Sequence, residues 1–443
     1  MNTELKSKST WFLTMSKKER SIPMLLFVFL ILTSLSIKDL YENINYSLNL
    51  NWVFIVLTSS LIVVCFLVSM NSVKQNKYGF YINLIFIYLI LLLLFYTENI
   101  LVFYISFEAT LIPMFFLILG WGYREEKIRA AFMFFYFTLV GGLFMLIVLM
   151  LMYSINGTFK INGLCLTENS YQTQKVWFLF MSLAFLVKIP IIPFHLWLPQ
   201  AHVEAPLAGS ILLAGILLKL GAYGLIKYAI PIFPQAIQIH SSWLQVIALI
   251  SIIYGGLSTI RQSDMKRLIA YSSVAHMGFS VYVLFAEPNQ LGAIACVIIL
   301  VAHGFVSPAL FIICGIIYER YLTRIMKYYG GLINIMPILG LMCFLFTVSS
   351  IAFPGSLNFI GETLCIWVSI YKCLSHAILV SLGAIVGLAY SLYFYEQIFT
   401  ARVTNFIRSK HQGVIKEELL SFLLLFIPVI TLGLYINPLI KYC

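Results

Sequence analysis

The sequence predicts an all-α, polytopic transmembrane helix bundle, and three observations lead to this fold class. Of the 443 residues, 61% are hydrophobic and only 10% are charged, which would leave a soluble globular protein with too much exposed apolar surface. Apolar runs of about 18–25 residues recur between residues 22 and 437, and each is long enough to cross a bilayer as a helix. The basic residues also gather in alternate loops, as they do in proteins that cross a membrane many times.

We expect about 13 spans, of which the eleventh is long and broken. In chain order they lie at 22–37, 52–70, 79–96, 99–119, 131–154, 176–200, 206–231, 243–260, 268–285, 291–318, 331–373, 376–400 and 418–437. These spans divide the chain into a polar N-terminal tail at 1–21, N-terminal spans at 22–70, a first repeat at 79–231, a second repeat at 243–400 and a C-terminal span region at 418–443.

The charge distribution orients the predicted bundle. Of the 28 lysines and arginines, 20 fall on the side that holds the N-terminus, and the other side holds only Lys38, Lys160, Lys175, Lys372 and Lys441. The positive-inside rule then places the N-terminus inside. The net charge of +11 therefore reflects membrane orientation and does not predict a nucleic-acid partner. The eight cysteines form no CxxC pair, so we expect them to be small buried hydrophobic residues.

Two of the predicted spans are interrupted by proline. The sixth contains Pro190 and Pro193, and the eleventh breaks at Pro354 and Gly355. Proline removes a backbone donor, and the carbonyl groups it frees must find protein or water within the membrane, so broken helices line polar cavities. In transporters such helices mark the ion pathway and occupy corresponding places in inverted repeats. The two breaks lie five spans apart, so we expect two inverted five-helix repeats, each with one broken helix.

Five ionisable side chains lie deep inside the apolar stretches, namely Glu108, Lys188, Lys219, His303 and Glu362. A charge at that depth costs roughly 2.5–3.5 kcal/mol, and such residues usually mark proton or ion pathways. A glutamate and a lysine lower each other's cost by pairing, and opening the pair releases or captures a proton. Glu108 and Lys188 are the candidate pair, although the sequence does not show that they meet. Lys227 is nearer a span end, where we expect it to reach water.

Each of these residues also has a purely structural interpretation. Glu108 would then be a protonated carboxyl group in a helix contact, His303 a hydrogen-bonded core residue, and Glu362 a cap of the half-helix after the second break. A lysine that extends to the membrane surface is the alternative for Lys188. The nearest span end is about a dozen residues away, beyond the reach of a lysine.

Four further residues are secondary candidates for a proton path: His195, His202, Glu204 and His276. His195 and His202 are seven positions apart, which places them on about the same face of a helix, but no cysteine or carboxylate cluster completes a metal site. We therefore expect no metal. The sequence contains no GxGxxG motif, P-loop or cysteine-rich cluster, so we expect no cofactor in this chain.

The segment that contains most of these candidates resembles a known family. Lys188 to Gly224 reads KIPIIPFHLWLPQAHVEAPLAGSILLAGILLKLGAYG, which is similar to the signature of the antiporter-like membrane subunits of respiratory complex I. RQSDMKRLIAYSSVAHMG at 261–278 and AHGFVSPALF at 302–311 extend the resemblance, which runs from about residue 80 to the end. The HLWLP and AHVEAP runs are highly specific to this family.

The resemblance implies a role for each buried residue. Glu108 matches the carboxylate on the helix before the first broken one, and Lys188 matches the lysine on that broken helix. Lys219 matches the bridging lysine, His303 the central histidine and Glu362 the terminal proton site. Subunits 2 and 5 and the Mrp-type antiporters have lysine at the terminal position. The family usually has fourteen spans with both ends outside, so we expect the first helix of the family to be missing here.

The resemblance also implies an assembly. It predicts a proton-translocating subunit of NADH:ubiquinone oxidoreductase in the mitochondrial inner membrane, with the basic side towards the matrix. Expected partners are lipids, accessory subunits and the other membrane subunits, especially subunits 2 and 5. FMN, iron–sulfur clusters, NADH and ubiquinone are expected in other subunits. A cation/proton antiporter subunit of the Mrp type and a non-transporting structural bundle are the alternatives. Co-purification with a NADH-oxidising assembly would argue against the antiporter subunit. The structural bundle predicts that neutralising the five buried residues leaves function intact.

Overall fold

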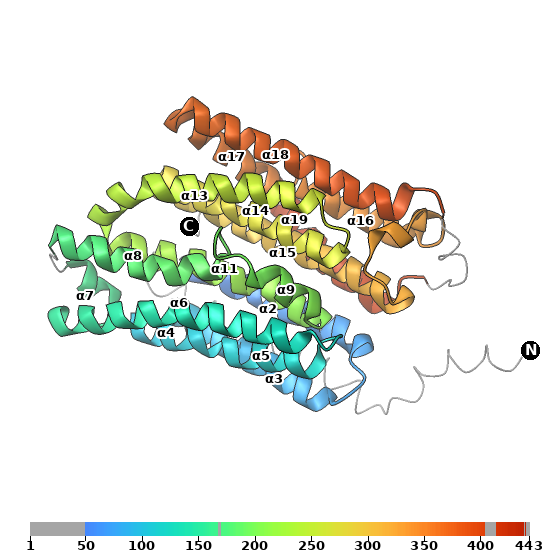
Figure 1. Ribbon diagram of the computed structural model, residues 1–443, viewed down its shortest axis with the longest axis horizontal. Helices are drawn as coiled ribbons and strands as arrows, with labels where there is room; N and C mark the ends of the chain where they lie inside the picture. Colours follow the sequence, from blue (N-terminus) through green and yellow to red (C-terminus); the bar gives the residue numbers. More distant parts are fainter. Residues whose placement is uncertain (1–48, 167–169, 404–412, 438, 440–443) are drawn as a thin grey trace, which may run out of the picture.

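The computed structural model describes residues 49–166, 170–403, 413–437 and 439, and most residues in this part of the chain are helical. No β-strand occurs in these ranges, which contain only two isolated bridges, Asn99–Lys160 and Asp264–Ile325. The helices run roughly along the long axis of the molecule (Figure 1). The predicted all-α transmembrane bundle is confirmed. The predicted tail at 1–21 and span at 22–37 lie outside the described residues.

Ten helices or helix runs in the described part are long and apolar enough to cross a membrane. Their bounds are α2 Asn49–Ser72, α3 Lys77–Tyr96, α4 Ile100–Ala109 with α5 Leu111–Trp121, α6 Lys127–Asn156, α10 to α12 Leu207–Ile232, α13 Pro234–Ile260, α14 Met265–Ala286, α15 Gln290–Tyr321, α18 Leu374–Tyr395 with η7 Glu396–Thr400, and α19 Lys416–Leu434. A short helix, α7 Ile161–Leu166, follows α6. The total of 13 spans and the repeat relation between the two halves stay predictions.

The first predicted break lies between α8 Tyr171–Lys188 and α9 Trp197–Glu204. Pro190 and Pro193 fall in the irregular segment between these helices. Side chains provide hydrogen bonds to the backbone there. The indole Nε1 of Trp197 donates to the Val187 carbonyl at 3.0 Å, and Ile192 N donates to Ser251 Oγ at 3.0 Å. The break is thus stabilised inside the protein, as non-helical backbone at membrane depth requires.

The second predicted break separates α16 Pro337–Ser350 from α17 Leu357–Lys372. Gly355 has a φ of +94°, a conformation in which glycine carries no steric cost. Asn358 Nδ2 donates to the Ser349 carbonyl at 2.8 Å, so a side chain in the first turn of α17 provides a hydrogen bond to a carbonyl group in the last turn of α16. Both expected breaks are therefore present.

The span from Leu207 to Ile232 has a feature that the hydropathy pattern does not predict. Its α-helical segments α10 Leu207–Leu212, α11 Leu218–Gly224 and α12 Ile230–Ile232 are separated by two π-helical turns, η3 Leu213–Leu217 and η4 Leu225–Ala229. Such turns are rare, and they often occur at functional sites. Lys219 lies in α11, directly between the two turns.

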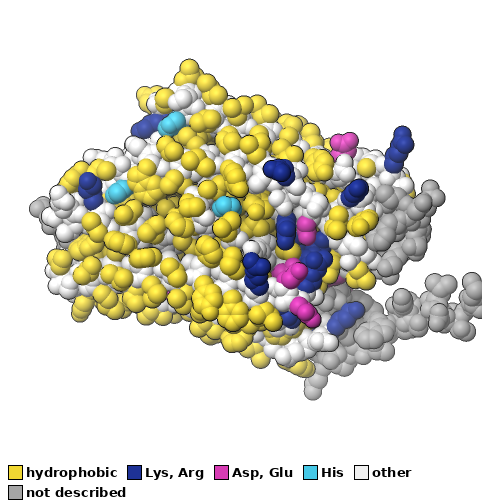
Figure 2. Space-filling model, in the orientation of Figure 1, with side chains coloured by type: hydrophobic (Ala, Val, Ile, Leu, Met, Phe, Trp, Pro, Cys, Tyr) yellow, Lys and Arg dark blue, Asp and Glu magenta, His cyan; other side chains and the backbone are white. Residues whose placement is uncertain are grey.

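The loops that carry the charges gather at one end of the bundle. Lysine, arginine, aspartate and glutamate side chains concentrate there, and apolar side chains cover most of the rest of the face shown in Figure 2. Contacts connect these loops. Trp121 Nε1 at the end of α5 donates to the Gln75 carbonyl in the α2–α3 loop at 3.0 Å. We refer to this end as the basic end. The opposite end includes the Asn99–Lys160 bridge.

Candidate functional site

Two buried residues form a contact at the centre of the bundle. Lys219 is 0% exposed, and its Nζ lies 2.8 Å from His303 Nδ1 on α15. The same ammonium donates to the Ala214 carbonyl in the π-helical turn η3. Gly215 and Gly304 allow η3 and α15 to approach closely, since a Cβ at either position would lie within 3.4 Å of the other's carbonyl oxygen. The glycines therefore bring the lysine and the histidine within hydrogen-bonding distance.

His276 continues this arrangement towards Glu362. The rings of His303 and His276 lie 5.6 Å apart between centroids, and His276 Nδ1 lies 3.5 Å from Glu362 Oε1. The hydroxyl of Tyr390 on α18 lies 3.1 Å from His276 Nε2. The structure therefore orders Lys219, His303, His276 and Glu362 across α11, α15, α14 and α17. We call these four residues the central array.

A small cavity adjoins the central array. Its volume of about 20 Å³ exceeds the roughly 10–15 Å³ that one water molecule requires. The side chains that line it include His276, His303, Ser307, Asn358, Tyr390 and Ser391. A second cavity borders both His276 and Glu362. The first cavity therefore has space for a water molecule beside the two histidines.

Glu108 and Lys188 lie close together, but no ion pair joins them within the described residues. Lys188 Nζ donates to the Phe107 carbonyl at 2.8 Å and to Thr110 Oγ1 at 3.4 Å. It also lies 3.7 Å from the centroid of the Phe107 ring, which is a cation–π contact. The two charges are near enough to interact electrostatically. Lys188 is therefore bound to the backbone next to Glu108 and not to the carboxylate itself.

The carboxylate of Glu108 fits against a glycine of α6. A Cβ at Gly142 would lie 2.1 Å from Glu108 Oε1, which is too close for any real contact. The same Oε1 is buried without a hydrogen-bond partner in the described protein. The neighbouring Gly141 faces Ala184 and Val187 of α8. The two glycines thus let α6 approach α4 on one side and the broken helix on the other.

We expect Gly142→Ala to impair proton translocation, because its methyl group must displace the Glu108 carboxylate from its place near Lys188. Gly120→Ala in α5 is the matched control, since a Cβ there meets no atom within 4 Å. Proton uptake and NADH oxidation by membranes carrying each variant measure the effect. Equal proton uptake in both variants, with equal amounts of assembled protein, would show that the position of the Glu108 carboxylate is unimportant.

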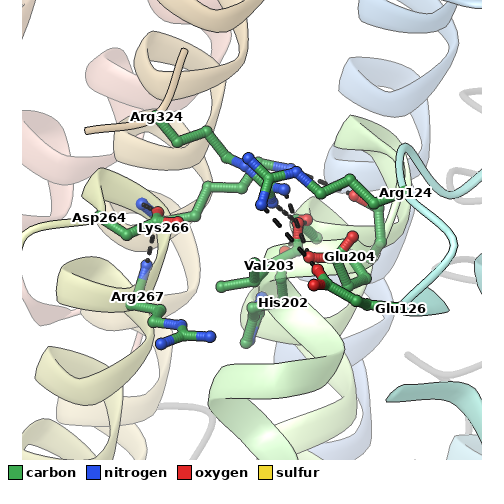
Figure 3. Close-up of polar contacts among 11 residues, drawn as sticks. Arg124, Glu126, His202, Val203, Glu204, Asp264, Lys266, Arg267 and Arg324 are labelled. Carbon is green, nitrogen blue, oxygen red and sulfur yellow. Dashed lines mark hydrogen bonds and ion pairs between the residues drawn. The ribbon is translucent and has the colours of Figure 1, made fainter. Parts of the chain in front are cut away.

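A network of buried charges lies at the basic end (Figure 3). Arg324 is 1% exposed, and it donates to Glu204 Oε1 at 3.3 Å and to the Val203 carbonyl. Lys266 Nζ donates to the Ala205 carbonyl at 3.1 Å. The end of α9 is therefore bound both to α14 and to the loop after α15.

Two further contacts support this network. Lys266 Nζ lies 4.9 Å from the centroid of the Tyr123 ring, and burial raises the pKa of the Tyr123 hydroxyl, so the ring stays neutral under the cation. Asp264 Oδ1 accepts from Lys266 N at 2.9 Å and from Arg267 N at 3.4 Å, which caps the first turn of α14. Tyr123 and Asp264 therefore support Lys266, whose charge also repels that of the neighbouring Arg324.

The other secondary candidates form no hydrogen bond or ion pair with the central array in the described residues, although His202 is near enough to Lys219 and His303 to interact with them electrostatically. The ring of His202 is fully buried and stacks on Phe311 with centroids 4.5 Å apart, and neither ring nitrogen has a hydrogen-bond partner in the described chain. His195 is also buried, and it faces the rings of Tyr254 and Tyr271. Across the described ranges, no group of three or more His, Cys, Asp or Glu side chains could hold a metal ion.

The sequence analysis missed several positions and contacts. Tyr390 is one of 26 tyrosines, and no pattern separates it from the others before the fold brings it to His276. Gly142 is equally inconspicuous. Lys227, which was expected to reach water, is partly exposed, and its ammonium is also hydrogen-bonded to Tyr223, Asn51 and Thr97, which the sequence did not indicate.

A bundle with two broken helices and buried ionisable residues between them is typical of antiporter-like membrane proteins that move protons or other cations. Residues 97–387 match the family model described as "NADH:quinone oxidoreductase/Mrp antiporter, TM". The chain belongs to this family of membrane subunits.

Curated relatives extend the match over most of the chain. The protein is 41% identical to NADH-ubiquinone oxidoreductase chain 4 of Marchantia polymorpha over 399 residues, which cover 89% of this chain and 80% of that protein. It is 40% identical to the same chain of Chondrus crispus over 400 residues, covering 90% and 81%.

Solved structures share the fold. A chain of respiratory complex I from Thermus thermophilus superposes with a TM-score of 0.82 at 27% identity, covering 89% of this chain and 83% of that one. A chain of the Mrp complex from Dietzia has a TM-score of 0.81 at 18% identity, covering 89% and 82%, which shows the common fold alone.

Proposed function

We propose that this chain is the proton-translocating membrane subunit of an NADH:ubiquinone oxidoreductase that corresponds to chain 4 of its relatives. The central array is the observation that carries the proposal, because it places four proton-exchanging side chains in sequence through the buried interior. Electron transfer from NADH to ubiquinone, in other parts of the complex, is the driving reaction. The relatives at about 40% identity favour this assembly.

The array allows a proton to be passed between neighbours. Lys219 and His303 are 2.8 Å apart, and like charges at that distance repel, so one excess proton is favoured over two. His276 lies between His303 and Glu362, and a neutral imidazole both donates and accepts. A water molecule in the cavity beside the two histidines would provide further hydrogen bonds. In this mechanism a proton on Lys219 passes through the histidines to Glu362.

Glu108 and Lys188 are the proposed switch. When the Lys188 ammonium moves from the Phe107 carbonyl to the carboxylate of Glu108, its charge is stabilised there, and the field felt by the array changes. Moving one charge against the membrane potential costs about 2.3 kcal/mol per 100 mV, so the switch requires energy from outside this chain. Redox chemistry elsewhere in the complex supplies that energy.

The proposal includes a location and an assembly. The chain lies in the mitochondrial inner membrane, with the N-terminus and the basic end towards the matrix. Its neighbours are other membrane subunits of the complex, in particular subunits 2 and 5, together with accessory subunits and lipids. FMN, iron–sulfur clusters, NADH and ubiquinone bind to other subunits, and this chain contributes no redox centre or nucleotide site.

Glu108→Gln and Lys188→Met test the function directly. Each removes one charge of the switch at nearly constant volume, so we expect NADH-driven proton translocation to fall severalfold while the complex still assembles. Glu126→Gln is the matched control, because its side chain is 70% exposed in a surface pair with Arg124. Proton uptake per NADH oxidised, measured in sealed membranes, is the readout. Unchanged uptake in both variants of the switch would overturn the assignment.

A cation/proton antiporter subunit of the Mrp type is the second candidate, and the shared fold favours it. Purification of the tagged chain from its native membrane separates the two. An associated NADH-oxidising activity supports the first function, and a stable assembly without that activity supports the second.

A further inference from the structure

At the end of the bundle opposite the basic loops, the Lys227 ammonium forms three hydrogen bonds to protein groups. Its Nζ donates to Tyr223 OH at 2.8 Å, to the Thr97 carbonyl at 2.8 Å and to Asn51 Oδ1 at 3.2 Å. A lysine ammonium has three donors, so all of them are used by protein. These acceptors come from α11, from the residue after α3 and from the first turn of α2. Lys227 thus joins three parts of the first half of the bundle.

The acceptors around Lys227 also bind one another. Tyr223 OH donates to Asn51 Oδ1 at 2.7 Å, and Tyr228 OH donates to the Thr97 carbonyl at 3.0 Å. Asn51 is 1% exposed, and Glu98 is close enough to interact electrostatically with Lys227. We call Lys227 and its three acceptors, Asn51, Thr97 and Tyr223, the lysine cage.

A layer of aromatic rings lies beside the cage towards the interior. It consists of Phe54, Phe95, Phe103, Tyr223 and Tyr228, each 0% exposed. The Tyr223 ring lies 4.9 Å from Phe95 and 5.4 Å from Phe54, and Phe103 lies 4.6 Å from Tyr228, all between centroids. Tyr223 follows Lys219 by four residues and precedes Lys227 by four, and four residues advance a helix by about 6 Å. Tyr223 therefore lies between the central lysine and the caged one along the helix, and the rings of Phe54, Phe95 and Phe103 pack against it.

We propose that the lysine cage and this aromatic layer form a seal, which closes the first half of the bundle to the membrane side opposite the basic end. The packed rings around Tyr223 place apolar surface between Lys219 and that side. The fixed ammonium behind them repels protons and other cations that approach from outside, as basic groups do in selective pores. The inference rests on the proposed function, because a seal of this kind matters where Lys219 carries a translocated proton.

The seal is tested by passive proton leak, without turnover. The intact complex is reconstituted in liposomes, NADH is withheld, a pH gradient is imposed, and its decay is followed with a trapped pH-sensitive dye. We expect Lys227→Met to accelerate the decay severalfold, since it removes the charge and leaves the cage acceptors without their donor. Lys227→Arg keeps both the charge and the hydrogen-bond donors, so the pH gradient should decay at nearly the wild-type rate.

Lys372→Met is the matched control, because it removes an exposed lysine, the last residue of α17, at the same end of the bundle. Tyr223→Phe removes only the hydroxyl at the centre of the cage and should raise the leak less than Lys227→Met. Wild-type leak in Lys227→Met and in Tyr223→Phe would overturn the seal. If Lys227→Met fails to assemble, wild-type leak in Tyr223→Phe alone overturns it.

The switch formed by Glu108 and Lys188 is tested by proton pumping, and the seal is tested by passive proton leak, so either proposal can fail without the other. A leak through Lys227→Met, together with normal pumping in Glu108→Gln and Lys188→Met, would retain the seal and reject the switch. Impaired pumping in those two variants, with no leak in the cage variants, would do the reverse.

Discussion

Replacing Lys219 with arginine is expected to abolish proton transfer through this subunit, although arginine keeps the positive charge. The guanidinium does not deprotonate in proteins, so it cannot exchange a proton with His303, 2.8 Å from the lysine nitrogen. Lys219→Met removes both charge and proton and is expected to have the same effect. Loss of a positioned proton-transfer group slows its step by roughly 10²–10⁴-fold. Coupled NADH oxidation and proton uptake in sealed membranes measure the loss.

The arginine variant separates proton transfer from structure. If the charge of Lys219 serves only to hold α11 against α15, Lys219→Arg should translocate protons normally once it assembles, whereas Lys219→Met should not. Lys372→Met provides the background for removal of a lysine, since Lys372 is exposed. Normal pumping in assembled Lys219→Arg would therefore disprove a role for Lys219 in proton exchange.

Replacing Arg324 with methionine is expected to cause the largest loss of stability. Arg324 and Glu204 are 1% and 4% exposed, and removal of one partner of a buried pair costs about 3–5 kcal/mol, because the other charge is left uncompensated. The network that holds the end of α9 to α14 and to the loop after α15 would also open. We expect little assembled protein and a markedly lower thermal-unfolding midpoint.

Two variants test this explanation. Arg324→Met combined with Glu204→Gln removes both charges and should recover part of the stability, as buried pairs often do when both members are replaced. Arg124→Met breaks a pair that is 3.9 Å long and half-exposed, so we expect a change of less than about 1 kcal/mol. Equal losses in Arg324→Met and Arg124→Met would show that burial of the charge is not the cause.

Much of the fold follows from local patterns in the chain. Hydropathy alone places most of the long helices within a few residues, because each apolar run has to reach across the membrane. The exceptions include α13, which begins nine residues before the predicted start at 243, and the short helix α7, which was not predicted. Pro190 and Pro193 predict the first break and Pro354 and Gly355 the second, since proline acts on the backbone whatever surrounds it. The two π-helical turns around Lys219 were not predicted, because the residues in them have no distinct hydropathy.

The candidate site was predicted as a set of residues but not as a set of contacts. His276 was a secondary candidate, and the fold places it between His303 and Glu362. Lys188 was expected beside Glu108, and it lies there, but it is bound to the Phe107 carbonyl. Lys227 was expected to reach water; it is partly exposed, and it is also hydrogen-bonded to Asn51, 176 positions earlier in the chain.

The sequence by itself determined the membrane fold class, the two helix breaks and the small group of ionisable residues at membrane depth. These properties depend on the transfer cost of each segment and on the backbone chemistry of proline, and both can be read along one chain. Only the tertiary structure decided which of those residues touch. The rotation of each helix about its axis, and close approaches at glycines such as Gly142 and Gly215, set the distances between side chains from remote segments. A hydropathy pattern does not encode those distances, because it records how deep a residue lies and not which neighbour it faces.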